Sequence, residues 1–255
     1  MTQGLLPFKY EQETKETGMT ALAGLPVYME LAQVMGLPES IQKHLKVREC
    51  GQGWTDSQMV ISLVLLNLAG GECVDDLDVL EKDKGFCEIL RQVETHGLKR
   101  KVRRALEKRW RKGRKRTVPS ASAVFRYLGA FHDAEQGKHR QVSKAFIPAP
   151  NVHLRGLARI NKDFAAFVQA QSPQSIATLD MDATLVVASK REALFCYLGD
   201  KAYQPLNTWW AEQAIILYSE FRDGNVPAGF ELLRVLKEAV ECLPEGVEKV
   251  RLRSD

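Results

Sequence analysis

The sequence predicts an α+β or α/β protein: a helical N-terminal half, then a mixed sheet of three strands, a crossover helix and a fourth strand. Three observations predict this class. Apolar residues recur at helical spacing from Gly24 to about Phe131, the period becomes strand-like at Ser175, and a helical stretch over 227–242 precedes the last strand. A helix that connects two strands of one sheet favours a parallel pair.

The composition is that of a soluble globular protein. Hydrophobic residues make up 45% and charged residues 27% of the 255 residues. The first residues do not resemble a signal peptide, and the longest apolar run, 59–69, is too short to cross a bilayer. Five cysteines without a CxxC pair argue against a disulfide framework or a zinc knuckle. We expect a cytoplasmic protein with no membrane partner.

Local signals place the first helices. A helix over 25–35 ends at Gly36, and Pro38 begins the next one. Thr55 and Gln58 match a capping box at the start of the apolar run, which Gly70-Gly71 terminates. The residues that follow, 74–93, predict two short helices.

A block of basic residues over 99–116 predicts a polyanion partner. It contains twelve Lys or Arg and one Glu, a local charge of +11, whereas the rest of the chain has 24 basic and 31 acidic residues, or −7. Leu98, Val102, Leu106 and Trp110 give this segment a thin apolar stripe at helical spacing. The basic residues expected to contact DNA phosphate are Lys99, Arg100, Lys101, Arg103, Arg104, Lys108, Arg109, Arg111, Lys112, Arg114, Lys115 and Arg116.

A second helix after Pro119 completes a helix–linker–helix pair that resembles a DNA-reading element. Ser120 caps this helix, and Val124, Leu128 and Phe131 share one face. Ser122, Arg126 and Tyr127 are the residues expected to read bases. The connection is longer than the tight turn of a helix-turn-helix motif, which weakens that comparison.

The chain divides into three parts at the sequence level. Residues 1–133 form a helical, basic DNA-binding region, 134–150 form a linker rich in Gly, Pro and charge, and 151–255 form a helix followed by the sheet. Within the last part, strands are predicted near 175–189, 192–199, 212–221 and 248–254.

Two acids share one face of the first strand. Side chains alternate across a sheet, so Asp180 and Asp182 lie on the same face and repel each other unless a cation lies between them. Asp255 follows the last strand, and two carboxylates at the ends of neighbouring strands form a frame for Mg²⁺. The alternative, a solvent-facing polar row and an acid without a special role, remains open for each strand taken alone.

Three strands, a helix and a strand, with acids on the first and fourth strands, make up the opening of an RNase H-like fold. At this point the sequence resembles the DDE transposases of bacterial insertion sequences, in the group typified by insertion sequence 1380. The resemblance covers most of the chain. It rests on LDMDAT at 179–184, KAYQPLNTWWAEQ at 201–213, FRDGNVPAG at 221–229 and VRLRSD at 250–255, together with the stretch at 54–86.

The resemblance implies a site in which three carboxylates hold two Mg²⁺ ions. It assigns the first acid to Asp182, with Asp180 as an accessory or competing ligand, and the second to Asp255. The third, a Glu on a later helix, matches no position, so we expect an N-terminal fragment with an incomplete RNase H-like sheet and incomplete catalysis. The implied partners are the inverted repeats of its own element as double-stranded DNA, and further copies of the chain on that DNA, near the bacterial nucleoid.

Other assignments remain open. The alternative function is a non-catalytic DNA-binding protein derived from a transposase, which competes with or regulates transposition; an RNA-associated basic protein is a third. Arg222 and Asn225 are expected to contact DNA phosphate, although strand-to-helix geometry explains them equally well. Lys201 and Tyr203 face either the DNA-binding groove or solvent.

Overall fold

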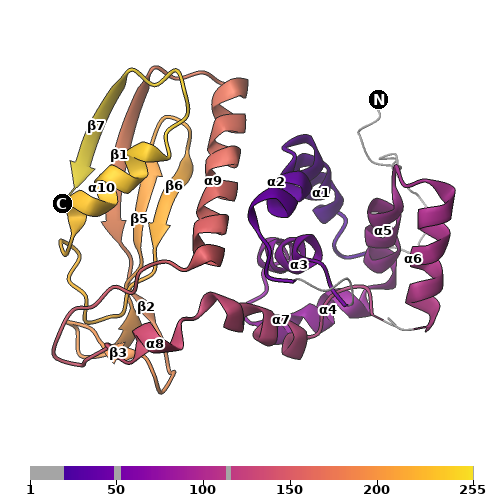
Figure 1. Ribbon diagram of the computed structural model, residues 1–255, viewed down its shortest axis with the longest axis horizontal. Helices are drawn as coiled ribbons and strands as arrows, with labels where there is room; N and C mark the ends of the chain where they lie inside the picture. The colour runs from indigo at the N-terminus through magenta and orange to yellow at the C-terminus, as the bar shows by residue number, and fades with distance from the viewer. Residues whose placement is uncertain (1–19, 49–52, 113–115, 255) are drawn as a thin grey trace. The chain divides into compact units, whose positions relative to one another are not determined.

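The computed structural model describes residues 20–48, 53–112 and 116–254, without the side chains of 106, 108–112 and 254. It divides into two compact units, residues 1–130 and 131–255, which are considered separately (Figure 1). No described helix is both long enough and apolar enough to span a membrane.

The first unit is helical, as predicted. Its elements are α1 (Leu25–Val34), α2 (Leu37–His44), α3 (Asp56–Leu68), η1 (Val74–Asp76), α4 (Leu77–Lys82), α5 (Lys84–Thr95), α6 (Arg100–Lys112) and α7 (Ala121–Leu128), with η2 (Gly129–Phe131) at the boundary. Local chemistry sets several of these ends. The capping box of Thr55 and Gln58 begins α3, with both hydrogen bonds formed, at 3.1 and 3.2 Å.

The segment that follows α6 is attached to α4. The Glu81 carboxylate accepts hydrogen bonds from the backbone N–H groups of Thr117 and Val118, each at 2.8 Å to one oxygen. Arg116 pairs with Asp78 on the same helix. Val118 is fully buried. These bonds fix where the chain leaves the basic segment and enters α7.

The expected linker is part of the second unit. Residues 134–150 contain the short helix α8 (Ala134–Gly137), and Arg140 pairs through two hydrogen bonds with Asp223, which is 7% exposed. The side-chain amide of Asn225 donates to three carbonyls of this segment, those of Gln141, Val142 and Lys144. Sequence composition predicts a free connection here, but long-range polar contacts hold it in place.

The main sheet of the second unit has four strands in the order β6-β5-β1-β7. These are β1 (Ile176–Ala183), β5 (Leu206–Trp210), β6 (Ile215–Glu220) and β7 (Lys249–Ser254). Strands β1 and β7 are parallel, as the crossover helix α10 (Leu232–Glu241) predicts, and the other pairs are antiparallel. The fold is thus a mixed helix and sheet structure.

Two strand predictions are wrong in their boundaries. The second strand of the main sheet is β5, whereas the predicted strand at 192–199 is mostly turn. Residues 186–203 instead form a separate sheet, in the order β2-β4-β3, from β2 (Val186–Val187), β3 (Leu194–Phe195) and β4 (Lys201–Tyr203). The predicted strand at 212–221 begins too early, because residues 211–214 turn the β5–β6 hairpin.

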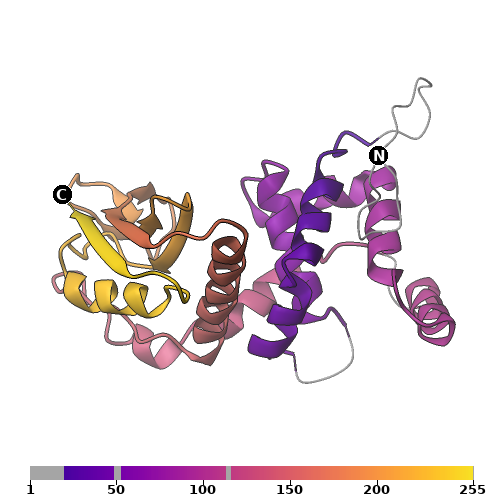
Figure 2. The same cartoon turned by 90° about the horizontal axis from the view of Figure 1, so that it is seen from above.

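Both long helices of the second unit pack on one face of the main sheet (Figure 2). Helix α9 (Val152–Gln171) contributes Ala165 to a core with Leu179, Trp210 and Leu217, and α10 contributes Val235 to a second cluster. All five are at most 1% exposed. On the opposite face of the sheet, Trp209 and Ile216 are 39% and 45% exposed, so that face is partly open to solvent.

Candidate functional site

The face of β1 without helices presents its polar side chains in a row. Leu179 and Met181 point to the helices, so alternation places Thr178, Asp180 and Asp182 on the opposite face. The sequence prediction of a shared face is confirmed. What the row can do depends on the partner of each carboxylate.

Asp180 is occupied by a cation from the neighbouring strand. The parallel register sets it opposite Arg253 of β7, and the guanidinium donates from Nε and Nη2 to the two carboxylate oxygens. These hydrogen bonds, together with the arginine charge, lower the pKa of Asp180 below its ordinary value. Arg253 therefore relieves the repulsion that two acids on one face create.

Asp182 keeps its carboxylate available at the end of β1. It is exposed, and the Thr184 hydroxyl donates to it at 3.5 Å. Among the described side chains, no Lys or Arg forms an ion pair with it. Across the strand pair it lies opposite Asn207, whose side-chain oxygen accepts from Ser219 at 2.7 Å. Oxygen atoms of four polar side chains therefore lie near the C-terminal end of β1, which we call the Asp182 edge: Asp182, Thr184, Asn207 and Ser219.

The last strand runs directly beside this acid. Ser254 of β7 is in register with Met181, the residue before Asp182. Asp255, the predicted second ligand, lies outside the described residues. Carboxylate oxygens suit Mg²⁺ in kind, but no group of three or more metal-ligating side chains exists among residues 20–48, 53–112 and 116–254.

Sequence reasoning missed a third carboxylate on the sheet. Glu212 lies in the β5–β6 turn and accepts from the Thr178 backbone N–H at 2.7 Å and from its hydroxyl at 2.5 Å. Burial opposes ionisation, yet these bonds leave the pKa of Glu212 lowered. The only sequence signal is an acid two residues after a strand, which is common in turns. Glu212 therefore secures the strand and does not join Asp182.

Arg222 and Asn225 are used inside the second unit. Arg222 is 1% exposed, pairs with Glu220 at 2.9 Å and donates to the Pro227 and Ala228 carbonyls. Asn225 holds the 141–144 segment through its amide. Burial of the Arg222 guanidinium favours the alternative interpretation of both residues, strand-to-helix geometry, over contact with DNA phosphate.

The basic segment forms a helix over 100–112, as predicted; its side chains are exposed over 99–105, whereas Glu107 is half-buried and Arg116 is half-buried in its ion pair with Asp78. Residues 99–105 are all exposed, and Arg103 pairs with Glu107 at 4.0 Å. Leu98 and Val102 of the expected apolar stripe are 36% and 46% exposed, so they are not packed in a core. Arg114 and Lys115 lie outside the described residues, and Lys108, Arg109, Arg111 and Lys112 are described without side chains.

Helix α7 presents part of its predicted reading face. Ser122 and Arg126 are exposed, and Phe125 beside them is 59% exposed. Tyr127 is instead 2% exposed and lies in the core of the first unit. The pKa of its hydroxyl is raised, mainly because the group is buried and also because the Asp56 carboxylate is close. Its place in the reading face was wrong because residues 123, 124 and 127, rather than 124, 128 and 131, form the buried stripe.

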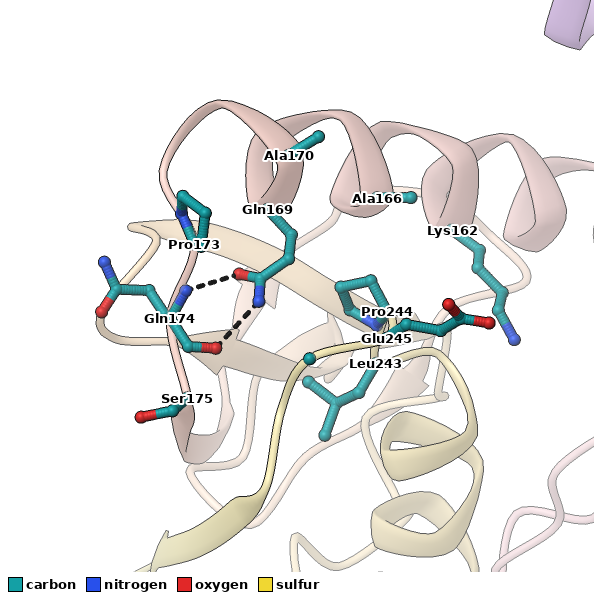
Figure 3. A pocket seen from close by; sticks show the side chains of 11 residues that line it. Lys162, Ala166, Gln169, Ala170, Pro173, Gln174, Ser175, Leu243, Pro244 and Glu245 are labelled. Carbon is teal, nitrogen blue, oxygen red and sulfur yellow. Dashed lines mark hydrogen bonds between the residues drawn. The ribbon is translucent and has the colours of Figure 1, made fainter.

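A surface pocket lies at the opposite end of β1 from these acids (Figure 3). It is formed between the end of α9 and residues 243–246. Gln169 dominates it and both accepts from the backbone N–H of Gln174 and donates to its carbonyl, at 3.0 and 2.8 Å. Its buried amide is thus engaged in fastening the turn before β1, so the pocket adds no reactive group to the Asp182 edge.

Comparison with known proteins supplies the family. No curated protein and no solved structure matches the chain. The model of one family, described as transposase DDE domain group 1, matches residues 11–255. This family generally uses divalent metal ions. Since the match spans almost the whole chain, the protein belongs to the transposase DDE domain family, and its function is that of a transposase.

Proposed function

We propose that this protein is an insertion-sequence transposase of the group typified by insertion sequence 1380, with Asp182 and Asp255 as metal ligands of an RNase H-like domain. When bound, two Mg²⁺ ions would activate water or a DNA 3′-hydroxyl and stabilise the leaving oxygen. The observation that carries the proposal is the difference between the two acids of β1. Arg253 engages Asp180, whereas Asp182 stays exposed at the strand end.

The sheet topology supports this placement. Two antiparallel strands follow β1, and a crossover helix then returns the chain to β7, parallel to β1 and on its other side. Met181 of β1 is paired with Ser254 of β7 in the parallel register. Asp182 follows Met181 in the sequence, and Asp255 follows Ser254. We propose that Asp182 and Asp255 bind one metal site from the ends of these adjacent strands, whereas Asp180 does not bind the metal because it is paired with Arg253.

DNA binding is assigned to the first unit. We propose that the basic helix α6 and its flanking residues contact the phosphates of the inverted repeats, and that Ser122 and Arg126 on α7 reach base edges. The exposure of residues 99–105 supports this, because cations on the surface can reach and neutralise phosphate. Two or more copies of the chain would assemble on the two inverted-repeat ends of the element.

Binding of Mn²⁺, a paramagnetic substitute for Mg²⁺, tests the metal site without an activity assay. In the wild-type protein we expect Mn²⁺ to broaden amide signals most strongly around Asp182, at residues 181–184, and less with increasing distance from it. Asp182→Asn and Asp255→Asn should abolish the broadening, whereas Asp180→Asn should retain it. If the broadening is lost in Asp180→Asn and retained in Asp182→Asn, then Asp180 and not Asp182 is the metal ligand, and the proposal is overturned.

The second candidate is a DNA-binding protein that regulates transposition without cutting. The exposed basic helix supports it, because binding through α6 requires nothing from the acid edge. A gel shift with inverted-repeat DNA that survives Asp182→Asn, with no cleavage by either protein, would favour this candidate. Mg²⁺-dependent cleavage by the wild-type chain that Asp182→Asn abolishes would favour the transposase.

A further inference from the structure

The small three-stranded sheet presents aromatic rings to solvent. We name the surface formed by Val186, Phe195, Lys201, Tyr203 and Phe221 the aromatic platform. Phe195 is in register with Lys201, and Val186 with Tyr203, so alternation along β4 places these four side chains on one face. Phe221 joins them, because its ring lies 4.8 Å from that of Tyr203.

Two of the three rings are exposed, and Tyr203 is half-buried, although the sheet that carries them is well packed. Phe195 and Phe221 are 56% and 60% exposed, whereas Ala202, which points to the other face, is fully buried. A Cβ added to Gly224 would lie 2.5 Å from the Ala202 carbonyl oxygen, which shows how closely residues 222–224, bridged to β4 through Asp223 and Tyr203, pack against that strand. The exposure of the rings is therefore a property of an ordered surface.

A fixed cation lies among the rings. The Lys201 ammonium is 5.9 Å from the centre of the Phe195 ring and donates to the Arg191 carbonyl at 2.9 Å. Charged groups are depleted from the centres of protein–protein interfaces. Rings beside a fixed cation instead suit a nucleic acid strand, whose bases stack and whose phosphates need a counter-charge.

The small sheet that carries the platform follows directly after the end of β1, the strand with Asp180 and Asp182. The chain leaves β1 after Ala183, forms the small sheet, and returns at Pro205, whose carbonyl accepts from the Thr184 backbone N–H at 3.1 Å. Figure 1 shows the small sheet at the end toward which β1 runs. Bases stacked here would belong to the strand whose backbone lies near Asp182.

We propose that the aromatic platform stacks unpaired bases at the DNA end on which the transposase acts. Phe195, Tyr203 and Phe221 supply the stacking surfaces, and Lys201 contacts the adjoining phosphate. Stacking tolerates any base sequence, because every base has a π-face. The inference rests on the proposed function, since it takes the DNA end to be bound at the Asp182 edge.

Fluorescence of 2-aminopurine tests the proposal with the full chain. The probe is a duplex with a short 3′ overhang that contains 2-aminopurine, and a blunt duplex of the same sequence is the reference. We expect binding to quench the probe, and the overhang to bind more tightly than the blunt end. Phe195→Ala and Phe221→Ala should each weaken overhang binding about tenfold, with blunt-duplex binding unchanged.

Two further variants of Phe195 separate base stacking from a general apolar contact. Phe195→Tyr should retain quenching, whereas Phe195→Leu should lose it, because leucine preserves an apolar contact but not a π-face. Tyr28→Ala is the matched control, since Tyr28 is an aromatic residue of similar exposure, 50%, on α1 of the first unit. It should behave as the wild type. Circular dichroism confirms that each variant is folded.

Several outcomes would overturn the inference. These are equal binding of overhang and blunt duplex by the wild type, full quenching by Phe195→Leu, or self-association of the chain that Phe195→Ala abolishes, which would assign the platform to a second copy. Failure of DNA binding, on which the proposed function depends, looks different: the wild type would then bind neither duplex. Blunt-duplex binding without an effect of Phe195 would overturn the platform alone.

Discussion

At the scale of single residues, Arg253 decides which acid of β1 is available. A neutral partner at that position would leave Asp180 and Asp182 as two like charges on one face. The guanidinium engages both oxygens of Asp180, and in doing so it also ties β7 to β1. One arginine therefore affects both the charge of the acid edge and the placement of the strand that leads to Asp255.

This pair predicts an acid-dependent loosening of β7. Because the folded-state pKa of Asp180 lies below its ordinary value, the pair contributes stability at pH values above about 4 that is lost as the pH falls through the lowered pKa. We expect the Arg253 Nε–H signal in NMR spectra to be slowed in exchange at pH 6 and to lose that protection in acid. Asp180→Asn should lack the protected signal at every pH. A protected signal in that variant would contradict the ion pair.

A second prediction concerns Gly224, whose backbone N–H donates to the Ala202 carbonyl of β4, a strand of the aromatic platform. Alanine there would place a Cβ 2.5 and 2.9 Å from the carbonyl oxygens of Ala202 and Leu194, so the backbone must shift. We expect Gly224→Ala to lower the free energy of unfolding by about 1–3 kcal/mol, measured by urea denaturation. Gly229→Ala is the control, because no atom lies within 4 Å of its added Cβ. Equal stability of the two variants would contradict the close packing.

At the scale of helices and strands, local signals predict more than long-range ones. Thr55, Ser120 and Asn151 cap α3, α7 and α9, and each is recognisable because a cap and its helix are adjacent in sequence. Strand β5 was missed because Pro205 and Asn207 interrupt a pattern that only its two neighbouring strands stabilise. The apolar run at 192–199 resembled a strand but is mostly a turn between two short ones.

The candidate site shows the same limit. The shared face of Asp180 and Asp182 follows from alternation along one strand, so sequence predicted it. The partner of Asp180 depends on a register between strands more than sixty residues apart, and no local pattern encodes it. Tyr127 was misplaced for a related reason, since which face of α7 is buried depends on α3 and η1.

A further prediction concerns DNA binding by the basic helix α6, which should depend strongly on salt concentration. If about six of its cations neutralise phosphates, the logarithm of the binding constant should fall with the logarithm of salt concentration with a slope of about −5. Replacing Arg103 and Arg104 with glutamine should reduce the magnitude of that slope by about 2, measured by fluorescence anisotropy. Replacing Arg191, an exposed arginine of the second unit, with glutamine is the control for charge alone. A slope unchanged in the double variant would locate the DNA contact elsewhere.

At the scale of the whole chain, charge and acid chemistry are divided between the units. Residues 1–130 contain 21 basic and 16 acidic residues, a charge of +5, and residues 131–255 contain 15 and 16, a charge of −1. The basic block accounts for this difference. This division of charge fits the proposed function, in which the helical unit contacts DNA phosphate and the sheet unit holds the metal ligands.

Separate cores in the two units predict separate responses to a core substitution. Leu179 is fully buried in the sheet unit, so Leu179→Ala should destabilise that unit by about 2–5 kcal/mol. In hydrogen exchange with mass spectrometry, we expect protection to fall across the main sheet and to stay unchanged in α3 to α5. Leu233→Ala, at a position on α10 that is 64% exposed, should leave both units unchanged. Loss of protection in both units together would mean that they unfold as one, and the helical unit could not then bind DNA independently of the sheet.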